Sequence, residues 1–153
     1  MMGLEKALRQ VQQRLDSIPL TAAMQLEPLV LSERDLSLCA PIEPNVNDKG
    51  TGFGGALASV ATLAGWALVS VLAERVEPGA FEVVVHKSNL EYQKPVRSSF
   101  TAKVGLPEES ELDSFEQKLK ERGKAALNLM VHLIADDGIA MLLTGRFVAY
   151  RSQ

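Results

Sequence analysis

A single uncharged stretch limits the folds open to this chain. From Phe53 to Ala73 no residue carries a charge, and the stretch is entered through the glycine-rich segment NDKGTGFGG. About 20 apolar residues suffice to span the hydrocarbon core of a membrane, so the length alone fits a transmembrane helix. Most of the residues are, however, glycine, alanine, serine or threonine, which contribute little to insertion and instead suit close packing. The composition therefore argues against a membrane span.

The glycines ahead of this stretch also match a dinucleotide-binding pattern. Gly50, Gly52 and Gly55 satisfy GxGxxG, and Glu74 stands about 20 residues further on, where that fold places an acidic residue. In that fold the first glycine follows a strand directly, whereas here the segment PIEPNVNDK intervenes and no alternation of strands with helices follows. Lys49 precedes the glycines, so the P-loop pattern is absent as well. We therefore reject a nucleotide-binding turn.

The remaining interpretation is a helix that is apolar on all sides because the rest of the protein surrounds it. Small side chains let a sheet approach such a helix closely, and larger ones fill the core. The sequence therefore predicts a long buried helix that ends near Val76, where Pro78 and Gly79 form a stop signal. The bulky residues of this helix are Leu57, Leu63, Trp66, Leu68 and Leu72.

The segments around this helix indicate an α+β fold. An amphipathic helix is predicted over residues 3–17, and a short solvated helix near 110–122, with Ser110 and Asp113 in a capping-box pattern and Gly123 at its end. Because most strand-like runs follow the central helix instead of alternating with helices, we expect an antiparallel sheet of about five to six strands. The predicted strand runs are 25–42, 81–96, 98–106, 125–135 and 139–151, the last two joined by a hairpin at Asp136-Asp137-Gly138.

Composition and charge narrow the function classes. The chain has 153 residues, which predicts a single domain spanning 1–153, and its formal net charge is −3. That balance, without clustered Lys and Arg, argues against nucleic-acid binding. With one cysteine, Cys39, no intramolecular disulfide is expected, and the charged N-terminus lacks the apolar core of a signal peptide, so we expect a cytoplasmic protein. No cluster of His, Cys and Asp has metal-ligand spacing, so no metal is expected.

Three segments are specific enough to indicate a family. They are PNVNDKGTGFGG (Pro44–Gly55), LAGW (Leu63–Trp66) and LEYQKPV (Leu90–Val96). On these segments the chain resembles the YiiD C-terminal-type thioesterases, a branch of the hot-dog acyl-thioester hydrolases. The resemblance implies a hot-dog fold, in which an antiparallel sheet wraps around a long central helix. It also implies a homodimer, or a homotetramer of two dimers, with acyl-thioester tunnels at the subunit interface beside the first turn of that helix.

Hydrolysis of a thioester requires a polarised carbonyl, an oriented water and a base or nucleophile. A helix N-terminus presents unpaired N–H groups and a partial positive charge, and glycines leave room for a carbonyl to approach. Gly54 and Gly55 are therefore the candidate oxyanion donors. The alternative is that both glycines only permit tight packing between the helix and the sheet.

The polar residues ahead of these glycines are candidates for the other roles. Asp48 is the only carboxylate near the start of the helix, which makes it the candidate base or nucleophile. Asn47 or Asn45 is the candidate to hold the water or the substrate carbonyl, with Thr51 beside them. The alternative is that these residues only shape the loop. Asn and Asp favour left-handed turns and helix caps, and Thr51 is itself a candidate cap.

Two departures from the hot-dog pattern favour a second function. Many hot-dog thioesterases carry a histidine before the paired glycines, where this chain has Phe53. Many also carry an acid within the central helix, where this chain has none between Phe53 and Ala73. The alternative is therefore a hot-dog module that binds an acyl thioester or fatty acid without hydrolysing it. A dehydratase or hydratase is disfavoured, because no histidine–carboxylate pair stands near Asp48.

The resemblance implies an acyl-CoA or acyl-carrier-protein substrate, with coenzyme A entering as part of the substrate and no separate cofactor. Basic side chains are then the candidates to contact a CoA phosphate or the surface of an acidic carrier protein. These candidates are Lys87, Lys94 and Arg97. The candidate apolar contacts with the substrate are Phe53 and Leu57.

Overall fold

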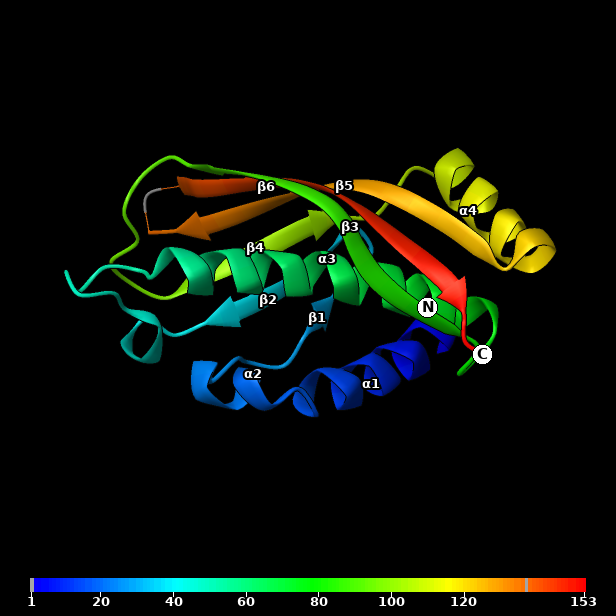
Figure 1. The fold of residues 1–153 in the computed structure, drawn as a ribbon, viewed down its shortest axis with the longest axis horizontal. Helices are drawn as coiled ribbons and strands as arrows, with labels where there is room; N and C mark the ends of the chain where they lie inside the picture. Colours follow the sequence, from blue (N-terminus) through cyan, green and yellow to red (C-terminus); the bar gives the residue numbers. More distant parts are fainter. Residues whose placement is uncertain (1, 137) are drawn as a thin grey trace.

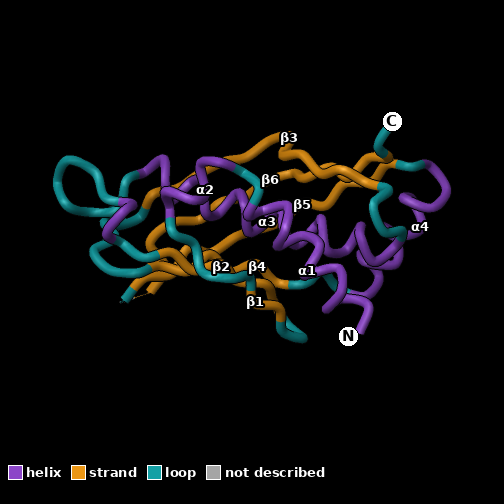
Figure 2. The backbone as a smooth tube through the Cα atoms, turned by 90° about the horizontal axis from the view of Figure 1, so that it is seen from below, coloured by secondary structure: helices purple, strands orange, loops and turns teal. Residues whose placement is uncertain are grey.

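A long helix, α3 (Gly54–Val76), runs through the centre of the protein, and a six-stranded sheet curves around it (Figures 1 and 2). This computed structural model describes residues 2–136 and 138–153. The strands lie in the order β1-β2-β4-β5-β6-β3, and each pairs antiparallel with its neighbours. The predicted α+β fold, an antiparallel sheet wrapped around the uncharged helix, is confirmed.

The helix α3 forms the core, as its lack of charge predicts. Among the described residues it is the one helix long and apolar enough to cross a membrane, yet 72% of its most apolar window is buried inside the protein. The sheet approaches it closely at Gly65, where a Cβ atom would lie 2.5 Å from Cζ of Phe147. A core helix with small residues is therefore what lets the strands close around it.

The strands alternate between a face toward α3 and a face toward solvent. On β5 the odd-numbered residues from Ala125 to Leu133 are all apolar and all buried, so the alternation in the sequence matches the face that packs toward α3. The predicted hairpin joins β5 to β6, although its Asp137 lies outside the described residues. The strands are β1 (Val30–Leu31), β2 (Asp35–Ala40), β3 (Phe81–Tyr92), β4 (Phe100–Gly105), β5 (Lys124–Ala135) and β6 (Gly138–Arg151).

A β-bulge in β3 reverses the alternation of that strand. Val85 and Lys87 are opposite adjacent residues of β6, so the register shifts by one at His86. Such a bulge places one extra residue on one strand and changes the face on which later side chains lie. Beyond it, Lys87 lies on the outer face of the sheet and Tyr92 on the face toward α3, where its ring contacts the start of that helix at Gly54.

Two further helices match the sequence prediction in position. The helix α1 (Met2–Asp16) buries Leu4, Ala7, Val11 and Leu15 in the core beside α3, as its amphipathic spacing predicts. The helix α4 (Glu109–Arg122) buries Phe115 and Leu119 and lies at the end of the sheet near the start of β5.

The end of α4 is as predicted but its start is not. Gly123 terminates the helix with φ 70°, a left-handed conformation that glycine adopts without strain. At the start the cap residue is Glu108, and no side chain caps the helix. The capping box at Ser110 and Asp113 was therefore wrong, because both residues lie inside the helix.

The region from residue 19 to residue 45 differs most from prediction. Pro19 begins a second helix, α2 (Pro19–Met24), since the N–H that proline lacks is unpaired in a first turn anyway. Gln25 ends α2 with φ 55°. The predicted strand at 25–42 therefore contains only the short strands β1 and β2, and a 3-10 turn, η1 (Glu43–Asn45), follows.

Candidate functional site

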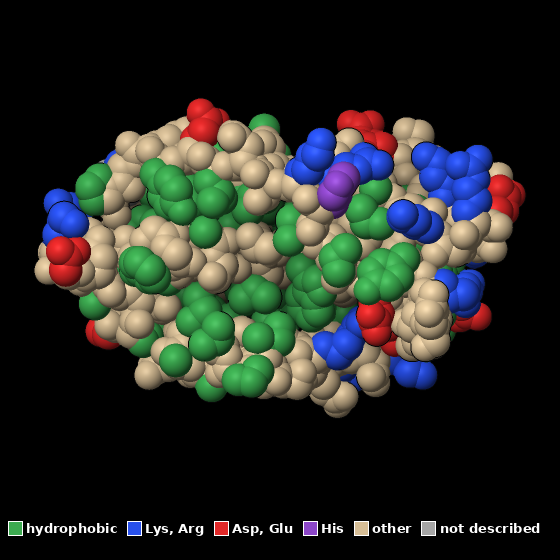
Figure 3. Space-filling model, viewed as in Figure 1, with side chains coloured by type: hydrophobic (Ala, Val, Ile, Leu, Met, Phe, Trp, Pro, Cys, Tyr) green, Lys and Arg blue, Asp and Glu red, His purple; other side chains and the backbone are tan. Residues whose placement is uncertain are grey.

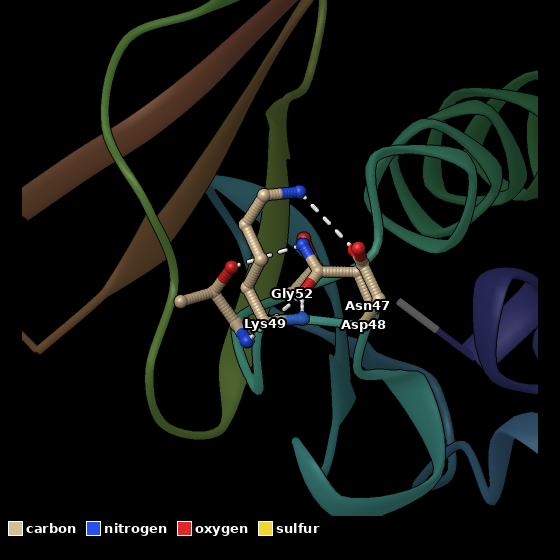
Figure 4. A network of polar contacts seen from close by, with 5 residues as sticks. Asn47, Asp48, Lys49 and Gly52 are labelled. Atoms are coloured by element: carbon tan, nitrogen blue, oxygen red, sulfur yellow. Dashed lines mark hydrogen bonds and ion pairs between the residues drawn. The ribbon is translucent and has the colours of Figure 1, made fainter.

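The loop that leads into α3 is held by one asparagine (Figure 4). The Asn47 Oδ1 atom accepts hydrogen bonds from the N–H groups of Lys49 at 2.8 Å and Thr51 at 3.2 Å, and Nδ2 donates to Thr51 Oγ1 at 2.9 Å. The Asn47 N–H donates to the Thr51 carbonyl at 2.8 Å. Asn47 therefore shapes the loop, as the turn interpretation predicts, and Thr51 belongs to the loop while Phe53 holds the cap position of α3.

The N-terminus of α3 presents N–H groups without partners inside the helix. The first hydrogen bond of the helix runs from the Leu57 N–H to the Phe53 carbonyl at 3.0 Å. The N–H groups of Gly54, Gly55 and Ala56 precede that bond, as in any first helical turn. Their partial positive charge is suited to an oxyanion that forms at this position.

Two aromatic rings flank this first turn. A Cβ on Gly55 would lie 2.7 Å from Cε2 of Phe53, and the Tyr92 hydroxyl donates to the Gly54 carbonyl at 3.0 Å. Both rings are 54% exposed, and Gly55 is itself exposed. A side chain at position 55 would therefore collide with the Phe53 ring. The first turn of α3 lies at the surface. Tyr92 was not a predicted site residue, and its signal was its place in the segment Leu90–Val96.

An open hollow of about 540 Å³ lies beside this turn and is lined by residues 46–49 and Phe53. Asp48 lies in it with its carboxylate 82% exposed and 3.1 Å from Lys49 Nζ. The structure therefore places the candidate base in the same hollow as Phe53, the cap residue of α3. A carboxylate in contact with bulk solvent is open to water, although a surface ion pair of this kind contributes little to stability.

Two predicted contact residues lie inside the protein instead. Asn45 is 3% exposed, and its Nδ2 donates to the carbonyls of Met24 at 3.0 Å and Pro41 at 2.8 Å. Its own carbonyl accepts from the Phe53 N–H at 2.7 Å. Leu57 is buried in the core below the loop. Asn45 thus satisfies buried backbone groups and Leu57 fills the core, so neither lines the hollow.

The three candidate cations lie on two different surfaces. Lys94 and Arg97 lie in the loop after β3, which packs against the glycine-rich loop because the Gly52 N–H donates to the Val96 carbonyl at 2.7 Å. Lys87 lies on the outer face of the sheet, away from α3. The structure therefore brings the loop that carries Lys94 and Arg97 against the glycine-rich loop, with the Lys94 ammonium near Gly138, and separates Lys87 from both.

An apolar groove of about 310 Å³ runs between α2 and the half-exposed stripe of α3. Figure 3 shows apolar side chains gathered across this face of the molecule. Sequence reasoning missed the groove because α2 was not predicted, and one of its walls is that helix. Its lining residues are Ile18, Leu20, Thr21, Met24, Ala58, Ser59, Thr62 and Leu63.

Within residues 2–136 and 138–153, no group of three His, Cys, Asp or Glu side chains is placed to hold a metal ion. The groups that can act on a ligand here are a carboxylate, a helix N-terminus, two aromatic rings and two cations. Together they can bind a polar carbonyl next to an apolar chain.

Comparisons with known proteins point the same way. The family model described as "Putative thioesterase (yiiD_Cterm)" matches residues 8–151. The structure of a protein of unknown function from Chlorobaculum tepidum is similar with a TM-score of 0.88 and 28% identity, covering 97% of this chain and 96% of that one. A "putative thioesterase" from Shewanella oneidensis has a TM-score of 0.77 and 28% identity, covering 95% of this chain and 98% of that one.

A more distant structure, titled "probable thioesterase" and from Pseudomonas aeruginosa, has a TM-score of 0.76 and 22% identity, covering 97% of this chain and 95% of that one. At that identity the likeness shows the fold alone. No curated protein sequence matches the chain.

Proposed function

The chain belongs to the family described as "Putative thioesterase (yiiD_Cterm)", and from that premise we propose that it hydrolyses the acyl thioester of coenzyme A or of an acyl-carrier protein. Family membership and the hot-dog fold support thioesterase function in general. One observation carries the finer proposal. The hollow beside α3 contains both the exposed carboxylate of Asp48 and Phe53, the cap residue that directly precedes the N–H groups of Gly54 and Gly55.

In the proposed reaction the thioester carbonyl oxygen accepts hydrogen bonds from N–H groups at Gly54 and Gly55. Asp48 removes a proton from a water molecule, whose oxygen bonds to the carbonyl carbon. The resulting oxyanion is stabilised by the helix N-terminus. The carbon–sulfur bond then breaks, and the thiolate takes the proton from Asp48, which leaves a carboxylic acid and a free thiol. Asn47 acts as a positioning residue, because its amide holds the loop that carries Asp48.

The carrier end of the substrate is assigned to Lys94 and Arg97. Both lie in the loop that is hydrogen-bonded to the glycine-rich loop through Gly52 and Val96. A planar guanidinium binds phosphate through two parallel hydrogen bonds, which suits a CoA phosphate or a phosphopantetheine group. The acyl chain is assigned to the groove between α2 and α3, because an apolar chain gains free energy by leaving water there.

A homodimer formed along β3 belongs to the same proposal. β3 is an outermost strand of 12 residues and pairs on one side only, with β6. Its exposed residues include Val84, Val85 and Tyr92. A long unpaired edge normally pairs with another strand or is covered. β3 also lies on the same side of the molecule as the apolar face of Figure 3, so a partner on this edge would cover the groove.

Sedimentation of purified protein tests the dimer. Val85→Lys places a charge on the edge strand and is expected to shift the protein toward the monomer, because the charge would be buried between two subunits. Met130→Lys is the matched control. Met130 is also an exposed apolar residue, but its strand, β5, has a neighbouring strand on both sides and is not an edge. A wild-type protein that sediments as a monomer at all concentrations would reject the dimer.

Thiol release from a panel of acyl-CoAs of increasing chain length, and from an acyl-carrier protein, tests the activity. Loss of a general base removes roughly 100-fold or more of the rate, so Asp48→Ala is expected to lower kcat by at least that factor with an unchanged unfolding midpoint. Glu43→Ala is the control, because Glu43 is an exposed acid in η1 that does not line the hollow.

If wild-type protein releases no thiol from any substrate, hydrolysis is rejected. The lack of an acid within α3 favours the second candidate, a module that only binds acyl thioesters. That function is then identified by acyl-CoA raising the melting temperature through mass action without thiol release.

A further inference from the structure

The outer face of the sheet carries a row of polar residues with two adjacent cations. The β-bulge at His86 places Lys87 on this face, where its direct partner on β6 is Arg146. Asn128 on β5 is in turn the direct partner of Arg146. The three residues therefore form one row across three neighbouring strands. Figure 3 shows Lys and Arg side chains with a histidine gathered over the middle of β3.

These residues line an open groove of about 630 Å³, with Asn89 and Thr144 in the adjacent row. The close approach of the bulged strand favours a glycine at the neighbouring position. A Cβ on Gly145 would lie 3.1 Å from the Lys87 carbonyl. The bulge, the glycine and the two cations are thus parts of one local arrangement, and bulges commonly re-aim side chains at functional sites.

The two cations are directly opposite each other on paired strands, and neither forms an ion pair with a carboxylate among residues 2–136 and 138–153. Like charges directly opposite on paired strands destabilise a sheet. Among the described residues, no carboxylate lies within 4.0 Å of the Lys87 or Arg146 side chain. The acids of β3, Glu82 and Glu91, are four or five positions from Lys87, which is roughly 13 Å or more along a strand. Glu82 instead accepts a hydrogen bond from the Tyr150 hydroxyl at 3.1 Å.

We infer that this row binds the phosphate groups of an anionic small molecule, with a diphosphate as the smallest ligand that spans it. Neighbouring strands are about 4.8 Å apart, so the Lys87 and Arg146 side chains can contact one phosphate and Asn128 can reach the next. The guanidinium supplies two parallel donors, the ammonium a point charge and the amide a neutral donor. The anion removes the repulsion between the cations. Because the whole chain has a net charge of −3, attraction of the anion has to come from these two cations and not from the overall charge of the protein.

This site does not depend on the proposed hydrolysis, because it lies on the face of the sheet opposite α3. Calorimetric titration with pyrophosphate tests it on the full chain, with inorganic phosphate and coenzyme A in parallel. Pyrophosphate is expected to bind once per chain and to raise the melting temperature. Because coenzyme A also has the proposed carrier site at Lys94 and Arg97, its affinity is compared between the wild type and Arg146→Gln. A loss of coenzyme A affinity in that variant indicates a nucleotide carrier as the source, whereas a loss of pyrophosphate affinity alone indicates free phosphates, and both outcomes support the site.

Two variants separate this site from general charge attraction. Lys87→Gln and Arg146→Gln are each expected to weaken pyrophosphate binding at least about tenfold, since each removes a charge-assisted contact. Without ligand, each is also expected to raise the melting temperature, because the like-charge pair is gone. Arg146→Lys keeps the charge but loses the paired donors, so binding falls without that gain in stability.

Lys118→Gln on α4 is the matched control, because it removes one exposed positive charge away from the groove. Its pyrophosphate affinity is expected to equal that of the wild type. The inference is overturned if pyrophosphate fails to bind the wild type, or if the control loses as much affinity as the groove variants. It is also overturned if removal of either cation lowers the melting temperature of the ligand-free protein, since the pair would then be structural.

Discussion

The Tyr92 hydroxyl donates a hydrogen bond of 3.0 Å to the Gly54 carbonyl, joining residues 38 positions apart in the chain. The contact fastens the last residue of β3 to the first residue of α3. The tyrosine ring also lies close to the glycine, since a Cβ there would be 3.5 Å from Cε1. The turn whose N–H groups are the candidate oxyanion donors is therefore held from outside its own helix.

Tyr92→Phe removes that hydrogen bond and keeps the ring. We expect the free energy of unfolding to fall by about 0.5–1.5 kcal/mol, the net contribution of one such bond, and thiol release to slow because the first turn of α3 is held less firmly. Chemical denaturation and steady-state kinetics measure the two effects. Tyr150→Phe is the control, because it loses a similar bond to Glu82 far from the site. Slower thiol release in both variants would remove Tyr92 from the site.

Gly65→Ala is expected to destabilise the protein. Alanine in a helix is normally more stable than glycine by roughly 1 kcal/mol. Here the new Cβ would lie 2.5 Å from the Phe147 ring, which is fully buried, so overpacking that costs about 1–3 kcal/mol is expected to outweigh the gain from alanine. The unfolding midpoint measures it. Adding Phe147→Leu to the Gly65→Ala protein should restore part of the lost stability. Gly105→Ala is the control, because its Cβ would meet nothing closer than 3.9 Å and no overpacking is expected. A stabilised Gly65→Ala protein would contradict the packing described here.

Asn45→Ala is expected to lower the free energy of unfolding by about 1–3 kcal/mol. The variant leaves the carbonyls of Met24 and Pro41 without their amide donor in a buried setting. Denaturant titration gives the value. Gln13→Ala removes an exposed amide from α1 and should change stability by no more than about 0.5 kcal/mol. An effect of Asn45→Ala as small as that of the control would show that water replaces the lost donor.

The pKa of the Tyr150 phenol is expected to lie above its ordinary value. The hydrogen bond to Glu82, and the charge of that carboxylate, raise the pKa of Tyr150 above 10.0. A raised pKa means that the folded state favours the protonated phenol. The resulting stability is therefore present below pH 10 and is lost as the pH rises through the folded-state pKa.

Phenolate absorbance measures this pKa cleanly in a Tyr92→Phe background, where Tyr150 is the only tyrosine. Adding Glu82→Gln should bring the midpoint back toward the ordinary value. A midpoint that the Glu82 substitution leaves unchanged would exclude the carboxylate as the cause.

Much of the fold follows from local patterns in the sequence. Helix α1 was predicted because its apolar residues, from Leu4 to Leu15, recur at helical spacing, and α3 because a charge-free stretch of that length needs protein on every side. The alternation from Ala125 to Leu133 predicted the buried face of β5. Helix α2 was missed because six residues are too few for periodicity to show.

The candidate site was predicted only in part. The sequence pointed to the glycine turn and to Asp48, and the structure places Asp48 in one hollow with Phe53, the residue that precedes that turn. Asn45 was misplaced because an asparagine in a turn and one that satisfies buried carbonyls have the same local sequence signature. Whether Asp48 acts as a base stays a prediction.

The sequence by itself determined which segments, α1, α3 and β5, supply the core, because periodicity and the absence of charge are local properties. Only the tertiary structure decided which face of β3 each side chain occupies. One extra residue at His86 shifts the alternation, so Lys87 lies beside Arg146 on the outer face and Tyr92 reaches Gly54 on the inner one. A bulge depends on the pairing of two strands that are distant in the chain, and no local pattern in either strand specifies that pairing.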